Sequence, residues 1–294
     1  MRAYHWIYAI VFLACDAAHA ELLVLVSDSK PSMSRVAHAV ADLHGVQTEI
    51  INLGGELTHA EGMVSRLRAR ETKNIVTIGL LASQLARRNL DNKIVVFCQV
   101  LNYEQFDLVT PWMKGVSALP SADSQFAAWR KLNPALQSVG LITGTQMNEL
   151  VHTSQIAAEK LALRLENRVV SSGREVPSAL SQLIGKIQGL WLVPDSSVLS
   201  TEVIRDTLTI ALRNNIQVLA FTPALLKEGA LLSATADEED IARAVLSQFE
   251  SLEKKGAFSH SSVITVDRAK IQINDKAAAR FNLKVTVEGN SHGS

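Results

Sequence analysis

The residues best suited to chemistry in this chain follow a short apolar run within residues 189–204. The run 190–193 predicts a buried strand that breaks at Pro194, so that Asp195 and Ser196 are exposed at its carboxyl end. In open α/β sheets, ligands bind where loops carry side chains over the carboxyl ends of strands. A carboxylate beside hydroxyl groups at such a place could hold an ammonium or a polar head group. The competing interpretation is that Pro-Asp-Ser-Ser is ordinary turn chemistry.

Polar side chains also follow other apolar runs that predict strands, such as residues 22–26, 94–98 and 138–143. Most are neutral hydrogen-bond donors and acceptors, and a single carboxylate accompanies them. Such a set suits the reversible binding of a zwitterion or another polar solute. Taken singly, each is equally explained as a solvated loop residue, but their shared position at strand ends favours a binding site. The predicted ligand-binding residues are Ser27, Ser29, Ser83, Gln99, Asn102, Thr143, Asp195, Ser196 and Thr222.

Signatures of enzymes and metal sites are missing from the sequence. It contains neither a Gly-x-Ser-x-Gly elbow nor a Walker-type glycine-lysine loop. The eight histidines do not fall at the spacing of metal ligands, and the acidic run 237–240 is best read as first-turn helix charge. We therefore predict a protein that is not an enzyme, with no catalytic residues, cofactor or metal site. A hydrolase or isomerase is the alternative, and it needs an acid–base pair that the sequence does not show.

The composition of the chain limits its possible partners, its size class and its cysteine chemistry. Lys plus Arg and Asp plus Glu each number 29, so no net field attracts nucleic acid or an anionic membrane. Hydrophobic residues make up 47% of the 294, which is enough for the full core of one large domain or two lobes. Cys98 continues the apolar run 94–98 and is predicted to be an inert core residue.

The first 20 residues predict an export signal. Arg2 precedes an apolar run that is too short to span a membrane, and Ala18 and Ala20 occupy the positions that a signal peptidase reads. We expect the mature chain to begin after Ala20, in the periplasm, without a membrane-spanning segment. Lipid anchoring at Cys15 is the less favoured alternative, because Phe12 stands where a lipoprotein box normally has leucine.

Strands and helices alternate in two successive series, which predicts an α/β fold of two doubly wound parallel-sheet lobes. The periodicity lapses from residue 99 to residue 111, where we place the first crossing between the lobes. The predicted divisions are 1–20 as signal peptide, 21–110 with about 236–260 as N-terminal lobe, 111–235 with about 261–287 as C-terminal lobe, and 288–294 as flexible tail.

Several ordered segments resemble the ABC transporter substrate-binding family, which has a type I periplasmic-binding fold. They lie at residues 115–120, 132–142, 192–200, 225–231 and 271–278, within a likeness that spans about residues 75–285. The resemblance implies two lobes that close on a solute about a hinge, with the chain passing between them more than once.

The same resemblance implies which loops contact the ligand. The family's Pro-Asp-x-x loop contributes a polar contact and maps onto Asp195 and Ser196, and the loops after the first and fourth strands map onto residues 27–29 and 99–102. Relatives bind amino acids, including aromatic ones. The first lobe departs from the family pattern, because the usual Gly-Phe of the first helix and the Asp-Pro after the fourth strand are both replaced.

Together, these features predict an exported solute-binding protein. It would hold a small polar ligand, with an amino acid as one possibility, between its lobes and deliver it to an ABC permease. The alternative is a diverged periplasmic binding or sensor module that docks on another envelope protein without transport. The expected partners are thus a small molecule and a permease or another envelope protein, and not nucleic acid.

Overall fold

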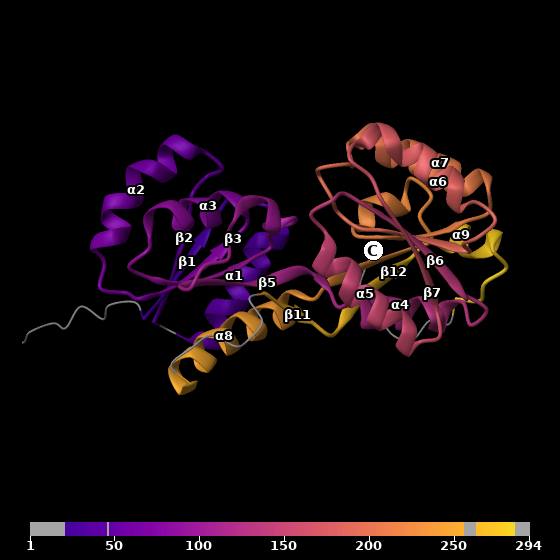
Figure 1. Cartoon of the computed structure of the whole chain (residues 1–294). Coiled ribbons are helices and arrows are strands. Elements are labelled where there is room, and N and C mark those ends of the chain that lie inside the picture. Colours follow the sequence, from indigo (N-terminus) through magenta and orange to yellow (C-terminus); the bar gives the residue numbers. More distant parts are fainter. Residues whose placement is uncertain (1–20, 46, 256–262, 286–294) are drawn as a thin grey trace, which may run out of the picture.

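The computed structural model describes residues 21–45, 47–255 and 263–285 and shows two α/β lobes side by side (Figure 1). The predicted export signal, which includes Cys15, and the predicted tail at 288–294 lie outside the described residues. Within the described part of the chain, no helix combines the length and apolarity needed to cross a membrane.

The first lobe is built on a parallel sheet with helices on both faces. Its elements are β1 (Leu22–Val26), β2 (Thr48–Asn52), β3 (Asn74–Ile78), β4 (Ile94–Cys98), β5 (Met113–Pro120), β11 (Val263–Val266), α1 (Pro31–His44), α2 (Leu57–Ala69), α3 (Leu80–Asn89) and α8 (Glu238–Lys255). The strand order is β11-β5-β4-β3-β1-β2. Helices α1 and α8 cover one face and α2 and α3 the other, so an uninterrupted apolar run such as β1 is buried along its whole length.

The second lobe repeats this plan. Its elements are β6 (Ser138–Thr143), β7 (Arg164–Val169), β8 (Gly189–Leu192), β9 (Gln217–Ala220), β10 (Leu232–Ala236), β12 (Ala269–Ile273), α4 (Ala122–Leu132), α5 (Asn148–Lys160), α6 (Val176–Leu183), α7 (Thr201–Arg213) and α9 (Asp275–Arg280). The strand order is β12-β10-β9-β8-β6-β7, and β12 alone runs antiparallel to its neighbour among these described strands. Two mostly parallel, doubly wound lobes confirm the predicted fold class.

Two tryptophans fix the core of the second lobe beneath the loop that follows β8. Trp191 Nε1 donates a hydrogen bond to Gln125 Oε1 at 3.0 Å, and Trp129 Nε1 donates one to Gln217 Oε1 at 2.9 Å. The Trp191 ring meets Phe126 edge-on, with ring centroids 4.9 Å apart. Both buried indole N–H groups therefore have hydrogen-bond partners, and β8, which leads to Asp195, packs in this hydrogen-bonded aromatic core.

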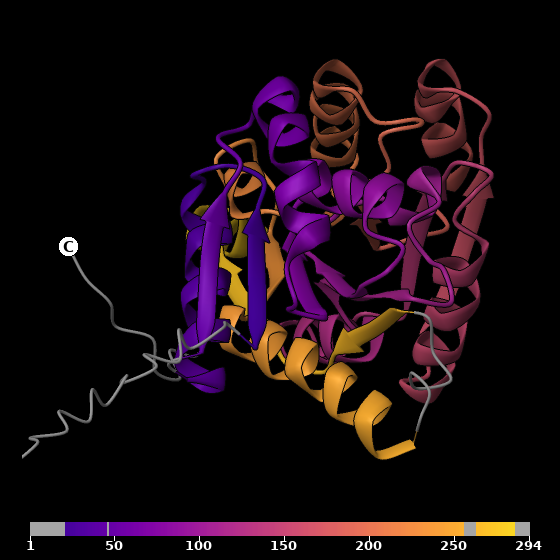
Figure 2. The ribbon, with the colours of Figure 1, turned by 90° about the vertical axis from the view of Figure 1, so that its left-hand side faces the viewer.

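The described chain crosses between the lobes after β5, after β10 and after β11. Ser121 N–H donates to Val266 O at 2.9 Å, which joins the first crossing to the third. Arg268, in the third crossing, donates to both oxygens of Asp240 on α8, at 2.8 and 2.6 Å. Figure 2 shows α8, in orange, lying along the lower edge of the first lobe. The hinge is therefore a bundle of three connected segments.

The first crossing lies later in the chain than the sequence indicated. We expected residues 111–235 and about 261–287 in the second lobe, whereas β5 and β11 belong to the first sheet. The lapse in periodicity after β4 is an excursion within the first lobe, which contains the 3-10 turn η1 (Tyr103–Phe106). The chain then returns to pair β5 with β4 in parallel, because another apolar strand extends the buried sheet.

Candidate functional site

Asp195 organises the second lobe's side of the interlobe cleft. Its side chain is 1% exposed, and its carboxylate accepts hydrogen bonds from Gly144 N–H at 2.7 Å and Ser197 N–H at 3.1 Å. These bonds join the loop after β6 to the loop after β8. Asp195 thus has the turn-forming role that the competing sequence interpretation described, and it also reaches the other lobe.

Hydrogen bonds link the two lobes at this point. Gln105 Nε2 donates to Asp195 Oδ1 at 3.5 Å, and Ser196 Oγ donates to Gln105 Oε1 at 3.1 Å. The side-chain amide of Asn102 lies 3.1 Å from Ser196 Oγ. Asn102 and Gln105 come from the excursion after β4, whereas Asp195 and Ser196 follow β8. The structure therefore brings together three of the predicted residues, Asn102, Asp195 and Ser196.

The predicted serines of the first lobe serve its own strand ends. Ser27 Oγ accepts from Ala82 N–H at 3.0 Å, and Ser83 Oγ donates to Gly79 O at 2.7 Å, both in buried positions. Ser29 Oγ, on the same loop as Ser27, accepts from an Asn52 amide N–H at 3.1 Å. These bonds hold β1 against α3 and β2, so the serines help to shape the loops at this end of the sheet.

The three remaining predicted residues differ in their surroundings. Gln99 has a left-handed backbone, with φ of 55°, at the turn after β4. Thr222 Oγ1 accepts from Ala224 N–H at 3.5 Å and caps a short 3-10 turn. The Thr143 hydroxyl is fully buried and has no hydrogen-bond partner within the described structure. Thr143 is thus a donor that still lacks an acceptor at the carboxyl end of β6.

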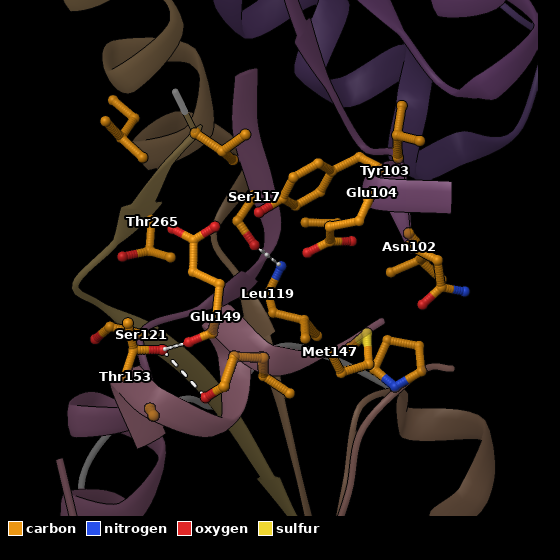
Figure 3. Close-up of a pocket in the computed structure, with 18 of the residues that line it drawn as sticks. Asn102, Tyr103, Glu104, Ser117, Leu119, Ser121, Met147, Glu149, Thr153 and Thr265 are labelled. Carbon is orange, nitrogen blue, oxygen red and sulfur yellow. Dashed lines mark hydrogen bonds between the residues drawn. The ribbon is translucent and has the colours of Figure 1, made fainter. Parts of the chain in front are cut away.

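A cavity of ≈ 460 Å³ lies between the lobes on the hinge side of these contacts (Figure 3). Its walls come from the excursion after β4, the end of β5, β11, the beginning of α5 and the loop after β8. Of the nine predicted residues, Asn102 lines it. The lining comprises Val100, Leu101, Asn102, Tyr103, Glu104, Ser117, Ala118, Leu119, Ser121, Ala122, Asp123, Met147, Glu149, Leu150, Thr153, Pro194, Val263, Ile264, Thr265 and Asp267. The lining therefore combines apolar side chains with polar and acidic ones, and its volume is that of a small-molecule site.

Carboxylates from both lobes give this cavity its charge. Tyr103 and Glu104 enter it from the first lobe and Glu149 from the second (Figure 3). Burial raises the pKa of the Glu104 carboxyl, and the nearby charges of Glu149 and Asp195 add to the rise, against hydrogen bonds from Tyr103 and from its own backbone. Burial also raises the pKa of the Tyr103 hydroxyl, as do the charges of Glu104 and Glu149. The described lining of the cavity thus carries acidic side chains that disfavour further negative charge there.

Sequence reasoning missed Tyr103, Glu104, Gln105 and Glu149. The first three lie where the periodicity lapses, and we had interpreted that lapse as an interlobe crossing. Glu149 lies in the first turn of α5, a position that helix chemistry alone explains. The available signal was a polar and aromatic cluster directly after a buried strand, which is where loops of an α/β sheet carry ligand contacts.

Two α/β lobes, joined by three hinge segments and enclosing a cavity with apolar and acidic side chains, define a fold of the type I periplasmic-binding class. The sequence model of one family, described as "ABC transporter substrate binding protein", matches residues 38–289. The chain belongs to this family. This finding confirms the resemblance stated above and the prediction of a binding protein that is not an enzyme.

Individual relatives are distant but cover most of the chain. A tyrosine-binding protein of Clostridioides difficile is 23% identical over 253 residues, which is 83% of this chain and 72% of that protein. The ligand-free, open structure of a Clostridium difficile substrate-binding protein with adhesive properties matches with a TM-score of 0.66 and 17% identity, covering 92% of this chain and 97% of that one. The structure of a Streptococcus pneumonia ABC domain in complex with L-Trp matches with a TM-score of 0.55 and 19% identity, covering 90% of this chain and 96% of that one.

Proposed function

We propose that this ABC transporter solute-binding protein holds a small polar, amino-acid-like ligand between its lobes and delivers it to a permease. The cavity of ≈ 460 Å³, which both lobes line beside the Asn102–Ser196 contact, carries this proposal. The distant relatives that bind tyrosine and L-Trp support an amino-acid-like ligand. The predicted export signal at residues 1–20 supports a periplasmic location.

Closure of the lobes explains how the site would select its ligand. A ligand stabilises the closed state by the contacts that it makes only there, so residues from both lobes must reach it. Asn102 already meets Ser196 across the cleft, and Gln105 meets Asp195 there. We propose that the other predicted residues, in particular the unpartnered Thr143, complete the site as the lobes close on the ligand.

A thermal-shift screen of residues 21–294 against amino acids, nucleosides, sugars and small anions tests this function. A ligand present at about a hundred times its dissociation constant adds about 2.7 kcal/mol to the free energy of unfolding. We expect at least one small polar solute to raise the melting temperature in a dose-dependent way. No shift with any solute of the panel would contradict the proposed function.

A second candidate function is a binding or sensor module that docks on another envelope protein without transport. The bonds of Gln105 to Asp195 and Ser196 favour it, because they join the two lobes directly through side chains of the protein itself. In that case we expect the chain to co-purify with an envelope protein whether or not solutes are present. Recovery of the chain alone from solubilised envelopes, together with a solute hit in the screen, would exclude this candidate.

A further inference from the structure

We infer that the interlobe cavity selects a ligand with a protonated amine whose carboxylate is absent or masked, and that Glu104 and Glu149 hold this amine from opposite lobes. This inference rests on the proposed function and narrows its ligand class. An amino-acid-like ligand carries both an ammonium and a carboxylate. The lining of the cavity favours the first group and disfavours the second.

The charges around the cavity are one-sided. Its lining includes Glu104, Asp123, Glu149 and Asp267, whereas none of the described lining residues is Lys, Arg or His. Asp123 already has a cation, because Lys160 Nζ lies 2.9 Å from its Oδ1. No ion pair joins Glu104 or Glu149 to a basic side chain within the described residues. The cavity therefore has unpaired negative charge.

Glu104 and Glu149 are placed so that a bound cation would join the lobes. Glu104 belongs to η1 of the first lobe, and Glu149 belongs to the first turn of α5 in the second lobe. Both side chains line the same cavity (Figure 3), and the charge of each contributes to the raised pKa of the Tyr103 hydroxyl. An ammonium between them would balance these charges and donate hydrogen bonds to both, which favours the closed state.

The cavity suits an organic amine. Its volume of ≈ 460 Å³ lies in the range of small-molecule sites, and Leu101, Leu119 and Met147 supply apolar walls for a hydrocarbon part. A free carboxylate in this space would meet Glu104 and Glu149, with no basic side chain among the described lining residues to balance it. An amine, amide or ester analogue keeps the favourable ammonium and avoids that repulsion.

Two matched ligand series test this inference by calorimetry on residues 21–294. One consists of tyrosine, tyramine and 3-(4-hydroxyphenyl)propionate, and the other of leucine, isoamylamine and 4-methylpentanoate. We expect at least one amine to bind, and to bind more tightly than its amino acid, whereas the carboxylate-only compounds do not bind. Tighter binding of an amino acid than of its amine, or no binding of either amine, would overturn the inference.

Variants test whether the two named residues hold the amine. Glu104→Gln and Glu149→Gln should each weaken binding of the better amine about tenfold or more, because each removes a charge-assisted hydrogen bond. Glu159→Gln, an exposed change on the same helix as Glu149 but outside the cavity, should leave the affinity unchanged. Unfolding transitions of all three variants report whether they are folded. Unchanged affinity in both cavity variants would refute the assignment.

The outcomes separate this inference from the proposed function. If only sugars, nucleosides, anions or free amino acids bind, the chain is still a solute-binding protein, but the inference of an amine ligand is wrong. If no solute of either panel binds, the proposed function and the inference fail together.

Discussion

At the residue scale, Asp195 has two roles that one substitution affects together. Asp195→Ala removes the acceptor of Gly144 N–H and Ser197 N–H in a buried position. We expect the free energy of unfolding to fall by about 1–3 kcal/mol, and the affinity for a ligand found in the screen to weaken by a similar amount. Urea unfolding and calorimetry measure the two effects.

Ser196→Ala is the matched control for the structural role of Asp195. It removes the Ser196 hydroxyl that meets Asn102 and Gln105 but leaves the bonds of Asp195 to its own lobe. We expect it to change the free energy of unfolding much less than Asp195→Ala does. An equal loss in both variants would mean that Asp195 does not tie the two loops.

Cys98 should be chemically inert in the native protein. It is fully buried at the end of β4, and burial raises the pKa of its thiol to about 12, which suppresses the reactive thiolate. In residues 21–294 it is the single cysteine of the sequence. We expect no reaction with Ellman's reagent under native conditions and one thiol per chain in denaturant. Rapid native labelling would show that β4 is not packed as described.

At the element scale, Arg268 joins the third crossing to α8. Its bidentate bond to Asp240 connects two hinge segments, whereas Arg243 pairs with Glu239 inside α8. We expect Arg268→Gln to broaden the distribution of distances between spin labels on the two lobes, because one constraint on the hinge is lost. Arg243→Gln should leave that distribution unchanged. Identical distributions in both variants would exclude the pair from control of the hinge.

Two paired carboxyl groups in the first turn of α8, those of Asp240 and Glu238, predict a dependence of stability on pH. The hydrogen bond from Arg268 lowers the pKa of Asp240, and for Glu238 the bond from Arg35 and nearby groups outweigh the effect of burial and also lower the pKa. Carboxyls of this kind stabilise the fold above their unfolded pKa values, about 4, and this contribution is lost as the pH falls through the lower folded values. Urea unfolding from about pH 6 to about pH 3 should show stability falling below about pH 4, and less steeply in Arg268→Gln.

Local patterns were sufficient to predict most elements. Uninterrupted apolar runs such as Leu22–Val26 and Ile94–Cys98 predicted buried parallel strands, because only a strand covered on both faces needs apolar residues at every position. Pro194 correctly marked the end of the strand that carries Asp195. The same reasoning assigned β5 to the second lobe, whereas it belongs to the first sheet. An apolar run indicates a buried strand but not the sheet in which that strand lies.

The site was less predictable than the fold. The strand ends of the two facing sheets converge, which brings Asn102 to the loop of Asp195 and Ser196. This convergence could be predicted, because the sequence shows which residues follow a strand. The roles of Gln105, Glu104 and Glu149 could not be predicted in this way. Their contacts depend on the distance between the lobes and on the orientation of the lobes, and no local sequence periodicity encodes either property. Ser27 and Ser83 were predicted to bind ligand, but their hydroxyls form hydrogen bonds with the backbone of α3 and of the turn before it.

At the scale of the whole molecule, the proposed function requires the lobes to move. The hinge bundle allows a rotation of one lobe against the other, and a ligand in the cavity contacts both. We expect the radius of gyration from small-angle scattering to decrease when a ligand identified by the screen is added. The same ligand should leave Asp195→Ala less compacted at equal concentration. An unchanged radius at saturating ligand would contradict a closing mechanism.

The position of α8 has a consequence for how the chain reaches its fold. Ile241, Val245 and Phe249 of α8 bury the same apolar face as α1, yet more than 100 residues of the second lobe are synthesised between them. The first lobe therefore stays incomplete, with an apolar face uncovered, until nearly the whole chain has been made. Contacts between such distant segments form slowly and expose the intermediate to aggregation. A chain that ends before α8 should be insoluble, and a holding chaperone would be needed until synthesis is finished.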